Sequence, residues 1–247
     1  APAPSSDPIQ EITVRQSGAL VVDGPSGQRW DIAMAVDIAP SIRVEGPLSR
    51  VGAGEMRLPF SASDDFAVIA GRAVFALDLA RVDRRYGLAV DPEPLDGLEV
   101  PLPLTVTGNR ARFTEVLAED FSQHPWANLP VALTLHARDD LGQTGQSQPF
   151  EMVLPGRRFF NPTAAAVIEL RRDLLWSREN APRVGQILRA ISHRPEGFMT
   201  NEDALLQLGA ATARLLGGLQ AGVTAELRDE VTTELRDEVT TMLWDAA

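Results

Sequence analysis

Apolar and polar residues alternate along the chain from residue 10 to about residue 155. A period of two is typical of β-strands that bury one face and expose the other. Clusters of Gly, Pro, Ser and Asp interrupt the alternation roughly every 8–12 residues, as turns between strands do. The pattern predicts about ten short strands without intervening helices, which favours an antiparallel β-sandwich of immunoglobulin-like type. A barrel is the competing architecture, but no regular hairpin spacing favours closure.

Two predicted strands show the alternation most clearly, residues 55–63 (EMRLPFSAS) and residues 129–137 (LPVALTLHA). Proline also occurs in strand-like runs, at positions 59, 101 and 103. Because proline cannot donate a backbone hydrogen bond, these positions predict edge strands or bulges rather than central strands. The apolar positions expected to share one face are Met56, Leu58 and Phe60 in the first strand, and Val131, Leu133 and Leu135 in the second.

The hydrophobic periodicity changes to that of α-helices after residue 160. Asn161 followed by Pro162 predicts a helix start, with asparagine as the N-cap and proline at the first helical position. A second helix is expected before the Pro195–Gly197 segment, a third capped by Thr200, and a fourth from about Thr224 to the end. Short connections make these helices antiparallel neighbours in a hairpin array or bundle.

The octad ELRDEVTT occurs twice in succession, at residues 226–233 and 234–241. Its apolar positions, continued by Leu243, recur every four residues. Four residues turn about 400° on an α-helix, so the apolar stripe drifts by about 40° per step. We expect a tandem duplication tolerated in an exposed helix; an elongated helix winding across a partner is the alternative.

These patterns predict an α+β protein with segregated elements, a β-sandwich followed by a helical region. The expected segments are a linker (1–9), strands of a first, possibly incomplete β-domain (10–37), the sandwich (38–156) and about four helices (161–247). We expect the sandwich to stay folded when the chain is truncated at Gly156. The first residues, APAPSSDP, lack an initiator Met and a signal-peptide pattern, so the chain is expected to be an internal fragment.

The amino-acid composition excludes several classes of function for this chain. The formal net charge is −11, and all 23 basic residues are arginine. An acidic chain lacks the basic field that nucleic acid or an anionic membrane surface requires. The absence of cysteine excludes disulfides, thiolate nucleophiles and thiolate metal sites. No apolar run is long enough for a transmembrane helix, so we expect no membrane insertion by this chain.

Two pairs of adjacent carboxylates follow predicted strands, Asp64–Asp65 and Asp139–Asp140. Calcium ligation is one interpretation, since this ion prefers carboxylate and carbonyl oxygens. The favoured interpretation is turn chemistry, because an aspartate bonds its own backbone two residues on. A calcium site needs six to eight oxygens, and neither pair belongs to an alternating Asp/Asn series.

The other candidate residues show no catalytic or metal-binding spacing. His124, His136 and His193 are scattered, without the pairings that zinc sites use. Ser122 lies near His124, but the sequence shows neither an oriented acid nor a group that could stabilise an oxyanion. Trp126 is expected to anchor a crossover in the core rather than to stack on a ligand.

Four stretches carry a resemblance to a known family: DIAPSI (37–42), ASDDFAV (62–68), the long run from DFSQHPW to ELRRDL (120–174), and LWDAA (243–247). They resemble a large bacterial family, found in alphaproteobacteria and anchored in the inner membrane, that carries a domain-of-unknown-function label. The resemblance implies N-terminal transmembrane helices, extracytoplasmic sandwich and helical segments, and a Gln/Gly-rich tail. It implies a periplasmic location for this chain and brings no catalytic residues.

We therefore expect a non-catalytic, extracytoplasmic interaction module of a larger membrane-anchored protein, without catalytic, cofactor or metal sites. Protein partners or self-association through the helical region are the expected interactions. The alternative is a module that binds carbohydrate or an envelope polymer, with Trp126, Trp30 and Tyr86 as stacking platforms. An aromatic content of 6% counts against this alternative.

Overall fold

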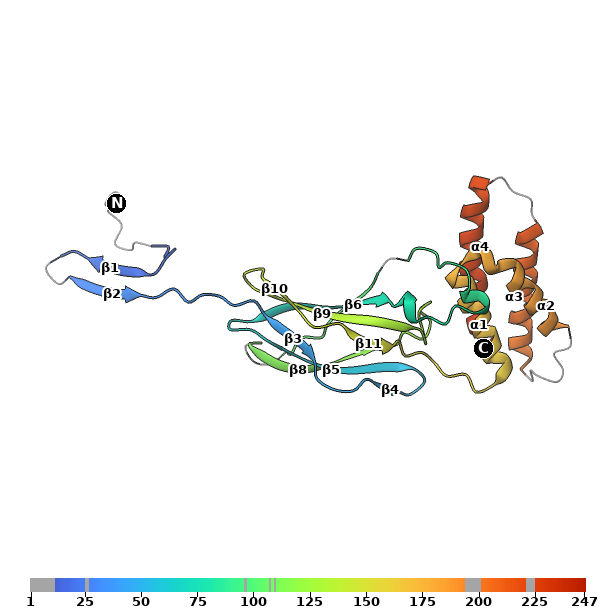
Figure 1. Cartoon of the computed structure of the whole chain (residues 1–247), viewed down its shortest axis with the longest axis horizontal. Coiled ribbons are helices and arrows are strands. Elements are labelled where there is room, and N and C mark those ends of the chain that lie inside the picture. The colour runs from blue at the N-terminus through green and yellow to red at the C-terminus, as the bar shows by residue number, and fades with distance from the viewer. Residues whose placement is uncertain are drawn as a thin grey trace. The chain divides into compact units, whose positions relative to one another are not determined.

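A computed structural model describes residues 12–24, 27–95, 97–106, 108, 110–193, 201–220 and 225–247, without the side chains of residues 220 and 225–232. It contains two compact units, the first ending at Ile38 and the second comprising Ala39–Ala247 (Figure 1). Antiparallel sheets precede the helices along the chain, which confirms the predicted α+β class.

The first unit contains a two-stranded antiparallel sheet. It pairs β1 (Gly18–Val22) with β2 (Gln28–Ile32), with Leu20 opposite Trp30. A turn joins them, in which the Gly27 N–H donates to the Gly24 carbonyl at 3.0 Å. The alternation that predicts strands from residue 10 also covers residues 12–15, and these form no strand. Alternation alone does not make a strand, because a strand also needs a hydrogen-bonding partner.

The second unit contains two antiparallel sheets that face each other (Figure 1). In one sheet, β5 is central: β3 and β4 pair with it, as does β8. In the other, β9 lies between β6 and the edge formed by β10 and β11, and β7 pairs with β6. The strands are β3 (Ser41–Val44), β4 (Ser49–Val51), β5 (Glu55–Ser63), β6 (Val68–Leu77), β7 (Leu98–Pro101), β8 (Arg112–Glu119), β9 (Pro130–Asp139), β10 (Thr144–Gln146) and β11 (Phe150–Val153).

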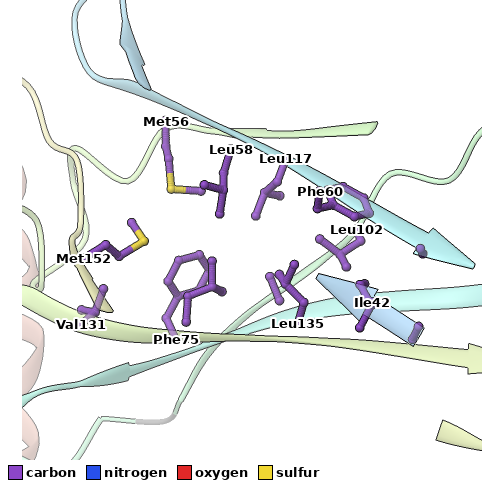
Figure 2. Close-up of a cluster of buried hydrophobic side chains, with 14 of the residues drawn as sticks. Ile42, Met56, Leu58, Phe60, Phe75, Leu102, Leu117, Val131, Leu135 and Met152 are labelled. Carbon is purple, nitrogen blue, oxygen red and sulfur yellow. The ribbon is translucent and has the colours of Figure 1, made fainter. Parts of the chain in front are cut away.

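The apolar positions predicted for β5 and β9 form the core between the sheets. Met56, Leu58 and Leu117 point toward Phe75 and Val131 of the opposite sheet in Figure 2. All six alternating residues predicted to share a face are at most 1% exposed. Burial of a large apolar side chain contributes about 1.5–3 kcal/mol, so this alternation is the main source of stability for the sandwich.

The prediction from Pro59 was wrong, because β5 is a central strand. The Pro59 carbonyl accepts from the Glu45 N–H at 2.9 Å, on the side of β5 where β3 and β4 pair. A residue's N–H and C=O point to the same side of a strand, so the missing donor faces the connection between β3 and β4. Pro101 lies at the end of β7, an edge strand, as expected.

The two aspartate pairs lie at strand ends. The Asp64 carboxylate follows β5 and accepts from the Phe66 and Ala67 N–H groups at 3.0 and 2.7 Å. Asp139 ends β9 and accepts from the Gln143 N–H at 2.7 Å. These are the backbone bonds of turn-forming aspartates. The second carboxylate oxygen of each is buried without a hydrogen-bond partner in the part of the chain that the structure describes.

In the described part of the chain, four α-helices follow the sheets. Asn161 caps α1 as predicted, accepting from the Thr163 and Ala164 N–H groups. The cap of α3 is Asn201, which accepts from the Asp203 N–H at 3.0 Å, and the predicted Thr200 lies outside the described residues. The helices are α1 (Pro162–Trp176), α2 (Ala181–Ser192), α3 (Glu202–Gln220) and α4 (Ala225–Asp245).

Both copies of the octad belong to α4. In the described part, Leu235, Val239 and Leu243 are buried against the other helices. The stripe is therefore part of the helical core in the second copy, which the expectation of an exposed helix did not foresee. The side chains of Leu227 and Val231, in the first copy, lie outside the described residues.

The helices are joined to the sandwich by the loop that follows β6. Trp176, at the end of α1, is 1% exposed and packs with Val82, Leu88 and Leu129 of the sandwich part. Its indole N–H donates to the Val90 carbonyl at 2.8 Å. This combination of apolar burial and directed bonds fixes α1 against the end of the sandwich.

Candidate binding site

A cavity of about 360 Å³ lies where the end of the sandwich meets α1. Three segments line it: the loop after β8 (122–128), the segment after β11 (157–160) and one face of α1 (165–172). Its volume is within the usual range for ligand pockets, roughly 300–1,000 Å³. We call it the arginine pocket, because Arg157, Arg158, Arg171 and Arg172 are among its lining residues.

The loop after β8 is folded by consecutive turns. The His124 N–H donates to Phe121, the Ala127 N–H to His124, and the Leu129 N–H to Trp126, each at 2.9 Å. Trp126 is 6% exposed and belongs to the sandwich core, which confirms its predicted anchoring role. A buried ring of this size anchors the loop that lines one side of the pocket.

The segment after β11 continues along this loop. The Leu154 N–H donates to the Leu129 carbonyl, and the Asn128 N–H donates to the Leu154 carbonyl. Gly54, in the turn between β4 and β5, lies close by, since an added Cβ would be 2.8 Å from the Arg157 nitrogen. Only glycine permits this approach, because a side chain at position 54 would clash with the Arg157 backbone.

Arg157 and Arg171 contact aromatic rings and backbone carbonyls of the described residues. The Arg157 guanidinium lies over the rings of Phe159 and Trp244, at 5.3 and 6.0 Å from the centroids. Arg171 also lies over Trp244, at 5.3 Å. Its Nε and Nη1 donate to the carbonyls of Thr240 and Gln123 at 2.9 and 3.1 Å. Burial lowers the pKa of Arg171, because desolvation disfavours the charged form.

Arg172 is different from its neighbours. Its Nε is buried and has no hydrogen-bond partner among the residues that the structure describes. A buried donor without an acceptor costs about 1–3 kcal/mol, and more when it is charged. The carboxylate of the neighbouring Asp173 accepts from Arg183 at 2.6 Å. Burial raises the pKa of Asp173, against the opposing effect of Arg183 and Arg172.

Among the described residues that line the pocket, one is an acid, Glu169, and four are arginines. His124 adds no charge near neutral pH, because burial lowers its pKa. Its Nδ1 accepts from the Trp126 N–H at 3.1 Å, and a ring nitrogen can accept a hydrogen bond only when it carries no proton. The pocket therefore concentrates positive charge in a chain whose net charge is −11.

Ser122 and His124 both line the pocket but are not arranged as a nucleophile and its base. The Ser122 hydroxyl donates to the Asp120 carboxylate at 2.5 Å, and the Ser122 N–H donates to the same oxygen. The hydroxyl proton is thus directed to Asp120, whereas His124 accepts from the backbone. This geometry supports anion binding better than nucleophilic chemistry.

The other residues singled out in the sequence do not converge on the pocket. His136 lies in β9 and His193 follows α2. In the described segments, no group of three or more His, Cys, Asp or Glu side chains is placed to hold a metal ion. Over the same segments, no helix has the length and apolar character needed to cross a bilayer.

The sequence reasoning missed the four arginines. The available signal was the pair of Arg-Arg doublets, 157–158 and 171–172. A third doublet, Arg84–Arg85, lies outside the pocket: Arg84 donates to the carbonyls of Leu88, Ala89 and Val90. A doublet alone therefore does not distinguish a binding arginine from a structural one.

Comparison with known proteins places the chain in a family. No curated protein matches it. A family model described as a domain of unknown function, DUF4175, matches residues 3–247. That match spans nearly the whole chain, and the chain therefore belongs to the DUF4175 family.

Proposed function

We propose that this chain is a non-catalytic interaction module that binds a negatively charged group of a protein partner in the arginine pocket. The observation that carries the proposal is the buried Nε of Arg172, without a partner in the described residues, beside three further arginines. Buried donors in folded proteins are almost always paired. An acceptor from another molecule would pair this one.

Guanidinium groups suit this role. They stay charged and present parallel N–H donors that match carboxylate and phosphate oxygens. The net charge of −11 does not prevent binding, because exposed charges farther away than about 8 Å are largely screened at physiological salt. The local excess of arginine then determines which ligands enter.

The proposal includes the setting implied by the family resemblance: an extracytoplasmic, periplasmic module of immunoglobulin-like type in a membrane-anchored protein. Partners contact the helical region through Arg171 and Arg172 of α1. The partner can also be a second copy of this chain, if that copy supplies the negatively charged group.

A polymer-binding module is less well supported. Trp126, one of its three expected stacking platforms, is buried. Tyr86 is 78% exposed in the second unit, and Trp30 is 45% exposed in the first. A buried ring offers no face on which a sugar could stack, so one of the three expected platforms is lost.

Isothermal titration with a blocked oligoglutamate peptide tests the proposal. We expect salt-sensitive binding that Arg172→Ala weakens by about tenfold or more, as expected when a charged hydrogen-bond donor is lost. Arg72→Ala is the control, because Arg72 is exposed on β6 and pairs with Glu99 at 3.5 Å. Equal losses in both variants would show that binding is not localised in the pocket. Retention on peptidoglycan that depends on Tyr86, and not on Arg172, would establish the polymer alternative.

A further inference from the structure

The positive charge of the arginine pocket exceeds what a singly charged ligand would balance. Four arginines and one acid, Glu169, are among its described lining residues, which leaves an excess of three positive charges. His124 does not change this balance near neutral pH, because burial lowers its pKa. Like charges gathered in one cavity repel one another, and each negative charge of a ligand reduces that repulsion. A ligand with two negative charges therefore gains more from this pocket than a ligand with one.

Three lining side chains have donors to offer to a ligand. Arg157 and Arg158 are exposed, and the described part of the chain supplies neither guanidinium with a hydrogen-bond acceptor or an ion-pair partner. In His124 the ring proton is on Nε2, because Nδ1 accepts from the Trp126 N–H. A phosphate group presents three charged oxygens to such donors, whereas a carboxylate presents two.

The arginines come from two walls of the pocket that meet at one aromatic ring. Arg157, in the segment after β11, lies 6.0 Å from the centroid of the Trp244 ring, and Arg171 of α1 lies 5.3 Å from the same centroid. Their guanidinium groups are therefore no farther apart than these two distances combined. The positive charge is gathered around one point, which suits a compact anion better than charges spread along a chain.

The size of the pocket also favours a compact anion. Its volume of about 360 Å³ is near the lower end of the range for ligand pockets, roughly 300–1,000 Å³. Two acidic side chains with the backbone that joins them need more room than one group with two charges. A phosphate monoester carries about −1.5 to −2 charges at pH 7 in a single group. The apolar lining residues Phe160 and Ile168 can contact the part of the ligand that bears the phosphate.

We infer that the arginine pocket binds a phosphate monoester carried by a side chain of the protein partner. This inference rests on the proposed function, because it specifies the charged group that the same pocket binds. Arg157 and Arg158 donate to the phosphate oxygens, and a singly charged group at the same place binds more weakly.

Isothermal titration of the full chain with four blocked peptides of otherwise identical sequence tests the inference. The central residue is phosphoserine, O-sulfoserine, glutamate or serine. The sulfate ester has the tetrahedral shape of the phosphate but only one charge, so this pair separates charge from shape. We expect the phosphoserine peptide to bind about tenfold more tightly than the sulfated and glutamate peptides, and the serine peptide not to bind. Inorganic phosphate, the fifth probe, should bind more weakly than the phosphopeptide, because it lacks the carrier.

Three variants localise the binding, and circular dichroism checks that each is folded. Arg158→Ala should weaken phosphopeptide binding by about tenfold, because a charged donor is lost. Arg189→Ala is the matched control, since Arg189 is also exposed without a partner in the described residues, but belongs to α2 and not to the pocket lining. Glu169→Gln should strengthen phosphopeptide binding more than binding of the sulfated peptide, because Glu169 repels a dianion more strongly.

The possible failures differ from one another. Equal affinity for the phosphorylated, sulfated and glutamate peptides, all weakened by Arg158→Ala, would overturn the inference and leave the proposed function intact. Inorganic phosphate that binds as tightly as the phosphopeptide would overturn the assignment to a protein partner. Equal losses in Arg158→Ala and Arg189→Ala would show that the phosphate does not bind in the pocket. If no charged peptide binds, the proposed function fails as well.

Discussion

The interface between the two sheets and the junction between the sandwich and the helices use different chemistry. Between the sheets, apolar side chains such as Leu58, Phe75 and Leu133 pack at 0% exposure. At the junction, Trp176 packs in a small apolar cluster and also donates to Val90, while arginines bond to backbone carbonyls and carboxylates. The first interface is non-directional, whereas the second requires particular atoms at particular positions.

This difference bears on function. A close-packed apolar interface leaves little room for a ligand, because its side chains fill the space. The junction combines bulky guanidinium groups with irregular backbone, and the arginine pocket lies there. Binding residues are often found on loops that a rigid scaffold positions, and the sandwich provides that scaffold here.

The largest expected effect tests whether the junction stabilises the fold as strongly as the sheet core does. Trp176→Ala should lower the free energy of unfolding by about 3–5 kcal/mol, as expected when a buried tryptophan is truncated. Phe75→Ala, in the sheet core, should have a similar cost and serves as the comparison. Urea unfolding followed by circular dichroism and tryptophan fluorescence measures both.

The same experiment examines whether residues 38–156 fold without the helices, as the sequence pattern predicts. With Trp176 shared between the two parts, we expect the spectroscopic signals to change in one cooperative transition. A helical transition that precedes loss of the β signal would show that the sandwich is autonomous and that the junction adds little.

A smaller loss of stability is expected when the ion pairs at the junction are removed. Glu93 accepts from Arg178 at 2.8 Å and from Arg236 of α4 at 3.1 Å, and all three side chains are at most about one-third exposed. Glu93→Gln should cost about 1–2 kcal/mol, because hydrogen bonds to charged groups in partly buried sites are stronger than surface pairs.

Glu99→Gln is the matched control, because its pair with Arg72 is exposed and longer, at 3.5 Å. We expect thermal unfolding of this variant to differ little from that of the wild type. Equal destabilisation by the two substitutions would mean that the Glu93 contacts behave as ordinary surface pairs.

The smallest change in stability is expected from substitutions of the aspartates at the strand ends. Asp64→Asn should lower stability by less than about 1 kcal/mol, because the amide oxygen still accepts from the Phe66 and Ala67 N–H groups. If Asp64 and Asp139 only form turns, the melting temperature should be the same with calcium as with a chelator. A calcium-dependent rise that Asp139→Asn removes would instead identify a cation site at this end of the sandwich.

The alternating pattern determined the sandwich, and the change of periodicity located the helices. Met56, Leu58 and Phe60 were assigned correctly to one face because strand side chains alternate irrespective of neighbouring strands. Asn161 was assigned correctly as a cap because capping is a local interaction. Pro59 was misassigned because its position in the sheet depends on which strands flank it and where they end.

The arginine pocket and the Glu93 contacts were decided only by tertiary structure. Arg171 meets Gln123 and Thr240 across separations of 48 and 69 residues, and Glu93 meets Arg236 across 143. The hydrophobic periodicity of a segment carries no information about contacts between residues so far apart in the sequence. Folding brings these side chains together through the packing of α1 and α4 against the sandwich. Local physics thus specified the elements of this protein, whereas their docking created the site, because a binding pocket is a property of surfaces that meet.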